Sequence, residues 1–265
     1  MFGTINRPPN LGVRTHQHTV DTVYERFPYK LENVIHDQEF AGKRAFIIGG
    51  GPSVEGFDYS VLDGEITIGI NKSGLEFKNS TIWYAMDYNL IGLILSGRLG
   101  EICKRRWDDY QGLKTFLVPF SAVKPIVGEP IYAIRRWAKP FRKFSFRLSD
   151  GLYGGNNSGY GALELAVCMG CNPIYLLGFD MRTKLVGGVE RTHSHDGYPY
   201  LWGGDYESKL KDFKIRTQGY IDEFRRVSIF LQNAGIQVYN LCQDSALDCF
   251  DFERLEDILH VAVRE

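Results

Sequence analysis

Three adjacent glycines, in the sequence GGGPS at residues 49–53, directly follow a short apolar segment. Glycine lets a backbone turn sharply and approach a ligand closely, and consecutive N–H groups at such a turn can surround a phosphate. No Gly-Lys-Ser/Thr follows, so this is not a Walker A loop, and Val54 stands where a dinucleotide fingerprint needs glycine. A tight structural turn remains an alternative, but the place after a strand favours a nucleotide site. The candidate phosphate-binding residues are Gly49, Gly50, Gly51, Pro52 and Ser53.

Two further polar positions suit a nucleotide. Asn71 ends the β-branched segment 66–70, and its amide can read a ribose hydroxyl or a base edge, or simply cap a turn or helix. The stretch GGNNSG at 154–159 opens a helical segment. Asn157 or Ser158 can cap that helix, and a glycine-rich approach to a helix N-terminus, here including Gly159, is also an anion site. Capping and ligand binding are compatible.

Gly178 and Asp180 end the apolar segment 174–177, and the polar loop after them carries His193 and His195. An imidazole, with an ordinary pKa of about 6.5, suits a general base. A metal site is a second possibility, although one intervening residue does not place both imidazoles on one helical face. A purely structural or surface role is the third. We take His193, His195 and Asp180 as the candidate catalytic residues.

The segment 124–147 is unusually basic, with seven Lys or Arg residues against the single acid Glu129, and aromatic residues are interleaved. Either it is an amphipathic excursion with a solvated basic side, or it is a lid or surface for an anionic partner. Such a partner can be a phosphate group, an acidic glycan, a lipid headgroup or a nucleic acid. Guanidinium groups bind such oxyanions bidentately, so Arg135 and Arg136 are the candidate contacts for an anionic group of the substrate or acceptor.

Composition narrows the class of protein. The chain has 265 residues, 31 basic and 32 acidic residues and a formal net charge of −1, which fits one large domain and excludes a generally polybasic nucleic-acid binder. Its apolar runs are too short to span a bilayer, and its first residues lack a signal-peptide core. Five scattered cysteines are typical of a reducing compartment, so we expect a cytoplasmic protein.

Short apolar segments alternate with helical ones along the chain. We expect strands at 45–48, 66–70, 81–86, 115–118, 174–177 and 236–241, and helices at 158–170 and 206–233. This alternation predicts an α/β, Rossmann-like fold: a mostly parallel sheet with helices on both faces and a basic, aromatic, lid-like excursion. The expected division is an N-terminal arm without a regular period at 1–40, a nucleotide-binding domain at 41–250 with a lid-like insertion at 124–150, and a C-terminal tail at 251–265.

The order of these motifs resembles the bacterial sialyltransferases of glycosyltransferase family 42. It is also similar to the related "domain of unknown function 115" group, which includes archaeal 6-hydroxymethylpterin diphosphokinases, and related proteins occur in phage genomes. The resemblance covers about residues 44–247. It is carried by GGGPS, by Asn71 after its strand, by Asn157–Ser158–Gly159 before a helix, by the sequence LGFD at 177–180, by the His-bearing loop and by VYNLCQDS at 238–245.

The resemblance implies an enzyme that binds a nucleotide-sugar and transfers the sugar to an acceptor hydroxyl with a His general base, without a required metal or cofactor. It places Gly49, Gly51, Pro52 and Ser53 around the phosphate, Asn71 at the ribose or base, Asn157, Ser158 and Gly159 along the sugar-nucleotide, Gly178 and Asp180 under the nucleotide, and His193 or His195 as base. The sialyltransferases have Gly-Asn-Gly-Pro-Ser, and here Gly50 replaces the Asn that assists the donor. Nucleotide binding is therefore a firmer expectation than a CMP-sialic acid donor.

Two alternatives come from the same residues. One is a diphosphokinase of the 6-hydroxymethylpterin type, which needs Mg²⁺ and has Asp87 and Asp180 as candidate ligands. The other is a non-catalytic nucleotide-binding phage protein that has kept the fold. For the favoured enzyme we expect a nucleotide-sugar donor, an acceptor hydroxyl on a glycan or another molecule, which can be anionic, no membrane span, and a homo-oligomer. A phage-encoded member would act in the host cytoplasm.

Overall fold

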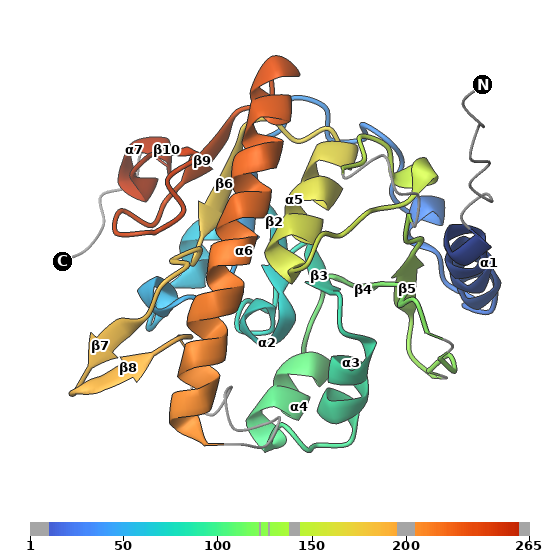
Figure 1. Cartoon of the computed structure of the whole chain (residues 1–265), viewed down its shortest axis with the longest axis horizontal. Helices are drawn as coiled ribbons and strands as arrows, with labels where there is room; N and C mark the ends of the chain where they lie inside the picture. Colours follow the sequence, from blue (N-terminus) through green and yellow to red (C-terminus); the bar gives the residue numbers. More distant parts are fainter. Residues whose placement is uncertain (1–10, 122, 127, 138–143, 195–204, 260–265) are drawn as a thin grey trace, which may run out of the picture.

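The computed structural model describes residues 11–121, 123–126, 128–137, 144–194 and 205–259 (Figure 1). Its centre is an eight-stranded sheet in the order β10-β9-β6-β1-β2-β3-β4-β5, in which all neighbours are parallel. The strands are β1 Ala45–Ile48, β2 Ile66–Ile70, β3 Ile82–Ala85, β4 Leu113–Leu117, β5 Ile131–Ile134, β6 Ile174–Leu177, β9 Val238–Asn240 and β10 Asp251–Phe252. The short strands β7 Lys184–Val186 and β8 Val189–Arg191 form a separate antiparallel pair.

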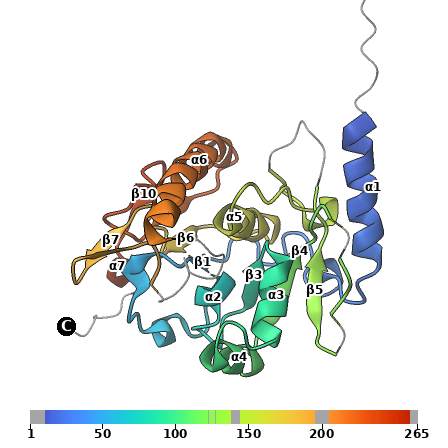
Figure 2. The ribbon, with the colours of Figure 1, turned by 60° about the horizontal axis from the view of Figure 1, so that its bottom comes forward.

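Helices cover both faces of this sheet. Figure 2 shows α5 and α6 on one side and α2, α3 and α4 on the other. The helices are α1 Leu11–Glu25, α2 Asn71–Gly74, α3 Tyr88–Leu95, α4 Glu101–Asp108, α5 Ser158–Cys168, α6 Tyr206–Asn233 and α7 Leu255–Leu259. Short 3₁₀ turns lie at Leu31–Asn33, Pro52–Val54, Tyr59–Leu62 and Leu148–Asp150. The predicted α/β fold with a parallel sheet between two helical layers is confirmed.

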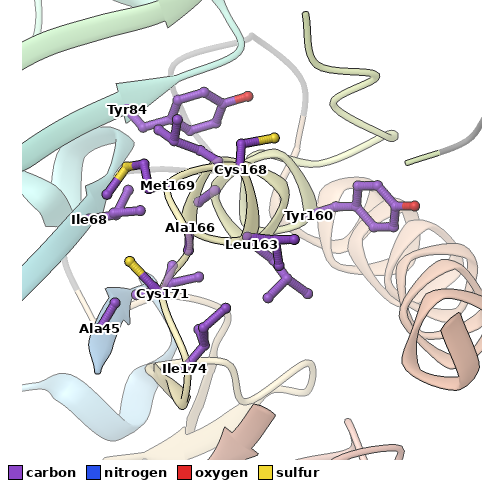
Figure 3. Packing of buried hydrophobic residues seen from close by; sticks show 14 of the residues in the cluster. Ala45, Ile68, Tyr84, Tyr160, Leu163, Ala166, Cys168, Met169, Cys171 and Ile174 are labelled. Carbon is purple, nitrogen blue, oxygen red and sulfur yellow. The ribbon is translucent and has the colours of Figure 1, made fainter. Parts of the chain in front are cut away.

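Strand β1 shows why the central strands appear in the sequence as continuous apolar runs. Ala45 and Ile47 point into the cluster that includes α5 and α6, whereas Phe46 and Ile48 point into a cluster on the opposite face, and all four are fully buried. A strand buried on both faces needs apolar side chains at every position. Figure 3 shows the layer around α5, in which Leu163 and Ala166 pack beside the strands, whereas Tyr160 points toward α6, where its ring centroid lies 5.8 Å from that of Phe224.

The strand order changes direction at β1. The chain moves outward from β1 through β2, β3, β4 and β5, and then returns to place β6 on the other side of β1. In open parallel sheets, ligands bind outside the carboxyl ends of the strands at such a switch point. The segments that follow β1 and β6 therefore define where a ligand site is expected.

The N-terminal segment differs from the prediction, because α1 occupies residues expected to lack a regular period. Val20, Val23, Tyr24 and Phe27 are buried against the half of the sheet that contains β4 and β5, and the Phe27 and Phe116 ring centroids lie 4.8 Å apart. Their i, i+3, i+4, i+7 spacing is a helical signal, although Phe27 follows the last residue of α1, Glu25. Polar residues dominate the rest of α1, which hid that signal. Figure 2 shows α1 beside the edge strand β5.

The basic segment also differs from the prediction. Instead of a lid-like excursion, its first half contains β5, which pairs with β4 in the register Leu117 to Ile134 and forms the edge of the sheet. The strand is only four residues long and cations follow it, which concealed it in the sequence. Basic side chains beside an edge strand are a common protection against edge-to-edge pairing. Residues 138–143 of this segment lie outside the described residues.

The C-terminal segment also differs from the prediction. The residues we expected to be a tail begin with β10, which pairs with β9 and extends the sheet.

None of the helices in the described part of the chain could cross a bilayer, because each is too short or too polar.

Candidate functional site

A cavity of about 820 Å³ opens at the carboxyl ends of β1, β2, β3 and β6. Its walls are the glycine loop after β1, the first residues after β2 and β3, the loop before α5, the segment after β6, Thr192 and His193, and one face of α6. This is the switch point of the sheet, and the volume is within the usual range for a small-molecule site, about 300–1,000 Å³. The predicted residues Gly49, Gly50, Gly51, Asn71, Asn157, Ser158, Gly159, Gly178, Asp180 and His193 all line it.

The glycine loop lies directly against the segment after β6. The Gly49 N–H donates to the Leu177 carbonyl at 2.7 Å, and the Gly51 N–H donates to the Gly178 carbonyl at 2.9 Å. A Cβ on Gly49 would lie 2.6 Å from the Gly178 oxygen, and a Cβ on Gly51 only 1.9 Å from Asp180 Oδ2. Both positions therefore need glycine for this close approach. The Gly51 N–H is already used inside the protein.

The Asp180 carboxylate holds the end of the same loop through hydrogen bonds to Ser53. The Ser53 N–H donates to Asp180 Oδ1 at 3.0 Å and the Ser53 hydroxyl donates to Oδ2 at 2.7 Å. The Cys242 thiol donates to the Ser53 hydroxyl at 2.8 Å, and burial raises the pKa of that thiol to about 12, so it stays protonated. Ser53 and Pro52 do not line the cavity. Cys242 was not predicted, since only its position after β9 brings it to Ser53.

Asn71 and the start of α5 meet on the next wall. Asn71 has φ 52°, a left-handed conformation that Asn tolerates, and its Oδ1 accepts a hydrogen bond from the Ser158 hydroxyl at 3.4 Å. Asn157 caps α5 by accepting from the Tyr160 N–H at 2.9 Å. The N–H groups of Ser158 and Gly159 are in the first turn, where a helix has no acceptor of its own for them. They lie in the cavity wall, at the positive end of the helix dipole.

Gly50 supplies another backbone group in the wall of the same cavity. Its carbonyl accepts from the Ser194 N–H at 2.9 Å, which ties the His-bearing loop to the glycine loop. None of the hydrogen bonds among the described residues uses the Gly50 N–H. Gly50 and the first turn of α5 therefore offer backbone donors to an anion in the cavity.

His193 lies in the cavity wall against α6. Its Nδ1 is 2.8 Å from the Thr192 hydroxyl, and its ring meets the Phe213 ring edge-on with centroids 5.9 Å apart. Burial lowers the pKa of His193 to about 4, and the positive charge of Lys72 adds to this. The imidazole is therefore neutral at pH 7, with one ring nitrogen able to accept a proton. His195 lies outside the described residues.

The two arginines predicted to hold an anion do not line the cavity. The Arg135 guanidinium lies 4.9 Å from the centre of the Tyr24 ring and 3.8 Å from Glu25 Oε1, so it joins β5 to α1. Arg136 is buried and its Nε donates to the Val118 carbonyl at 2.9 Å. Both side chains are used in packing the edge of the sheet.

A buried acid that was not predicted supports the loop before α5. Glu164 is fully buried and accepts hydrogen bonds from the backbone N–H groups of Ser145, Tyr153 and Gly154 at 2.5, 2.9 and 2.7 Å. Burial raises its pKa to about 7, while those N–H donors and the charge of Arg136 act in the opposite direction. In the sequence, Glu164 interrupts an apolar helix, and that was the only available signal.

The predicted metal ligands lie in the cavity wall but have other partners. Asp87 caps α3 by accepting from the Asn89 N–H at 2.9 Å, and both Asp180 oxygens accept from Ser53. Within the described ranges, His, Cys, Asp and Glu side chains do not form a group of three or more that could hold a metal ion.

Comparison with known proteins does not show a family for this chain. No family model matches the sequence, and no curated protein matches it. Among solved structures, the chain is similar to the MAf glycosyltransferase from Magnetospirillum magneticum AMB-1, with 13% sequence identity and a TM-score of 0.45 over 86% of this chain. The chain spans 36% of the length of that protein. A likeness this distant does not carry a function from one protein to the other.

Proposed function

We propose that the protein is a glycosyltransferase that uses a nucleotide-sugar donor. The observation that carries the proposal is that one cavity, at the switch point of the sheet, joins backbone donors suited to phosphate with a neutral imidazole. An enzyme that displaces a nucleotide from a sugar needs both features: stabilisation of the leaving phosphate and a base for the acceptor hydroxyl.

In this proposal the nucleotide lies along two neighbouring walls of the cavity. Its phosphate would accept hydrogen bonds from the Gly50 N–H and from the first turn of α5 at Ser158 and Gly159. The nucleoside would lie towards β2, where the Asn71 amide can bind a ribose hydroxyl. Ser158 already contacts Asn71, so the two walls are close enough for one nucleotide.

In the transfer step, His193 would act as the general base. The proposal requires that Nδ1–H donates to the Thr192 hydroxyl and that Nε2 takes the proton of the acceptor hydroxyl. The acceptor oxygen forms a bond to the anomeric carbon while the bond from that carbon to the phosphate oxygen breaks. The electron pair leaves with the nucleotide, and the acceptor proton goes to Nε2. A low pKa keeps the imidazole unprotonated before the reaction, although it also makes the base weaker.

A magnesium-dependent diphosphokinase remains the second candidate, because Asp87 and Asp180 line the same cavity. Mg²⁺ is commonly held by one or two carboxylates together with substrate phosphates. In that version the carboxylates would have to exchange their present hydrogen bonds with Ser53 and Asn89 for the ion. The non-catalytic version keeps nucleotide binding and lacks turnover.

A thermal-shift panel followed by a turnover assay separates these versions. The probes are CMP, CMP-sugars, UDP- and GDP-sugars, ATP and 6-hydroxymethylpterin, each with and without Mg²⁺. A ligand at 100 times its Kd stabilises the native state by about 2.7 kcal/mol. We expect a nucleotide-sugar to raise the Tm without Mg²⁺ and to release its nucleotide when an acceptor is present. Stabilisation by ATP and pterin only with Mg²⁺ would favour the diphosphokinase, and binding without turnover would favour the non-catalytic protein.

A further inference from the structure

The face of α6 that lines the cavity carries a positive charge that the functional proposal has not yet used. Its side chains repeat every three or four residues, so they form one stripe along the helix. The members of this stripe, which we call the α6 wall, are Tyr206, Leu210, Phe213, Arg216, Thr217 and Tyr220, and Asp212 beside the stripe also lines the cavity. Among the described residues that line the cavity, Arg216 is the only one with a permanent positive charge.

The position of Arg216 along α6 can be read from its neighbours. Phe213 contacts the His193 ring, and Glu223 accepts from the Asn156 N–H at 3.0 Å and from the Asn156 side chain at 2.7 Å. At a rise of about 1.5 Å per residue, Arg216 is about 4.5 Å along the helix from Phe213 and about 10.5 Å from Glu223. It therefore lies between the imidazole and the loop that leads into α5.

The present partner of Arg216 is weak. Its guanidinium is 3.7 Å from the Asp212 carboxylate one turn earlier, and the two side chains are 68% and 64% exposed. An exposed pair at this spacing contributes little to stability, so a ligand oxyanion can replace Asp212 at small cost. A guanidinium can offer two parallel donors to a phosphate or carboxylate, whereas the 3.7 Å contact with Asp212 is too long for a hydrogen bond.

We propose that Arg216 binds an oxyanion of the substrate that is distal to the nucleoside, and that Asp212 holds the guanidinium while the site is empty. The oxyanion is the second phosphate of a nucleoside diphosphate or a carboxylate on the transferred group. This inference rests on the proposed function, because it takes the first phosphate to lie at Gly50 and the start of α5. It adds the substrate class: a donor with more than one anionic group.

The test compares the parent, Arg216→Gln and Asp212→Asn by titration calorimetry at two salt concentrations. The probes are CMP, CDP, UMP, UDP, UDP-glucose and UDP-glucuronate. Arg225→Gln is the matched control, since Arg225 is also an exposed α6 arginine paired with an aspartate, Asp248 at 2.9 Å, but it does not line the cavity.

We expect Arg216→Gln to weaken binding of the probe with the distal oxyanion about 10- to 100-fold, the usual value of a charge-assisted hydrogen bond, and to reduce its salt dependence. The monophosphates should bind Arg216→Gln as tightly as they bind the parent. Arg225→Gln should bind every probe as tightly as the parent does. Asp212→Asn should bind the same probe as tightly or several-fold more tightly, because a competing carboxylate is gone. A loss that begins with CDP and UDP assigns the second phosphate, and a loss confined to UDP-glucuronate assigns the carboxylate.

Three results would overturn the inference. Equal Kd values and equal salt slopes for the parent and Arg216→Gln would remove Arg216 from the site while leaving the proposed function intact. An equal loss for CMP and UMP would contradict a distal position, and weaker binding by Asp212→Asn would contradict its role as competitor. If the parent binds none of the nucleotides, the proposed function fails and this inference fails with it.

Discussion

Replacement of Gly51 by valine is the perturbation for which the structure gives the sharpest expectation. A Cβ at this position would lie 1.9 Å from Asp180 Oδ2 and 2.7 Å from the Gly178 oxygen, so either the loop or the segment after β6 must move by about 1 Å or more to restore ordinary contact. The move would stretch the hydrogen bond from the Gly51 N–H to Gly178, and would disturb both bonds between Ser53 and Asp180.

The magnitude follows from these contacts. A neutral hydrogen bond contributes about 1 kcal/mol and a bond to a charged group about 1.5–3 kcal/mol, so the three bonds together set an upper limit of about 4–7 kcal/mol. Measured overpacking usually costs about 1–3 kcal/mol, because neighbours relax, and we expect a loss of unfolding free energy in that range. Nucleotide affinity should fall further, about 100-fold, because displacement of positioning groups by about 1 Å has effects of that size.

The assay is urea unfolding of the parent and the variant, together with a nucleotide titration of each folded protein. Gly92→Ala in α3 is the control, since nothing lies within 4 Å of a Cβ at that position. It should gain about 0.5–1 kcal/mol, because alanine favours a helix over glycine, and it should bind nucleotide like the parent. A Gly51→Val variant with parental stability and parental affinity would refute the reasoning and leave the glycine loop as an ordinary turn.

The remaining predictions concern three polar side chains. His193→Gln should lower turnover about 10²- to 10⁴-fold with unchanged nucleotide affinity. Since burial lowers its pKa from 6.5 to about 4, the unfolded chain takes up this proton first, so the parent should lose stability as pH falls from 6.5 to about 4. The variant should lack that part of the loss in acid denaturation curves, and full activity in it would exclude His193 as the base. For the glycosyltransferase, activity should survive chelation and Asp87→Asn should behave like the parent; an ATP-consuming activity that needs Mg²⁺ and disappears in this variant would establish the diphosphokinase instead. Ser53→Ala should lower the free energy of unfolding by about 1–3 kcal/mol, because an Asp180 oxygen and the Cys242 thiol lose their partner, and equal urea midpoints would show that this network is not important.

The sequence predicted those features whose causes are local. The apolar runs at 45–48 and 174–177 became β1 and β6, because a strand buried on both faces leaves a continuous apolar signal, and the β-branched segment 66–70 became β2. A glycine or Asn follows each of these strands. The stripe at 206–233 became α6 with the same bounds, since Asp205 accepts from the Ser208 N–H at its start and Gly235 follows its end. The cavity lies at the carboxyl ends of these strands, where the sequence predicted the ligand site.

Features that depend on distant contacts were not accessible in the same way. Whether Arg136 is exposed or buried depends on β4, whose last residues precede the Val118 carbonyl that accepts from its guanidinium. Glu164 is tolerated inside the core only because three backbone N–H groups from other segments converge on it. The pairing of Cys242 with Ser53 joins positions 189 residues apart. Nothing in the local pattern around these residues fixes such partners.

The central claim is that a nucleotide phosphate binds where the loop after β1 meets the start of α5, and the crystal structure of a complex tests it most directly. The complex should contain the nucleotide or nucleotide-sugar that raises the Tm most. The account predicts phosphate oxygens within about 3.2 Å of the Gly50 N–H and of the Ser158 or Gly159 N–H. It also predicts the nucleoside beside Asn71. A nucleotide held elsewhere, or one whose phosphates lie away from both the glycine loop and α5, would contradict it.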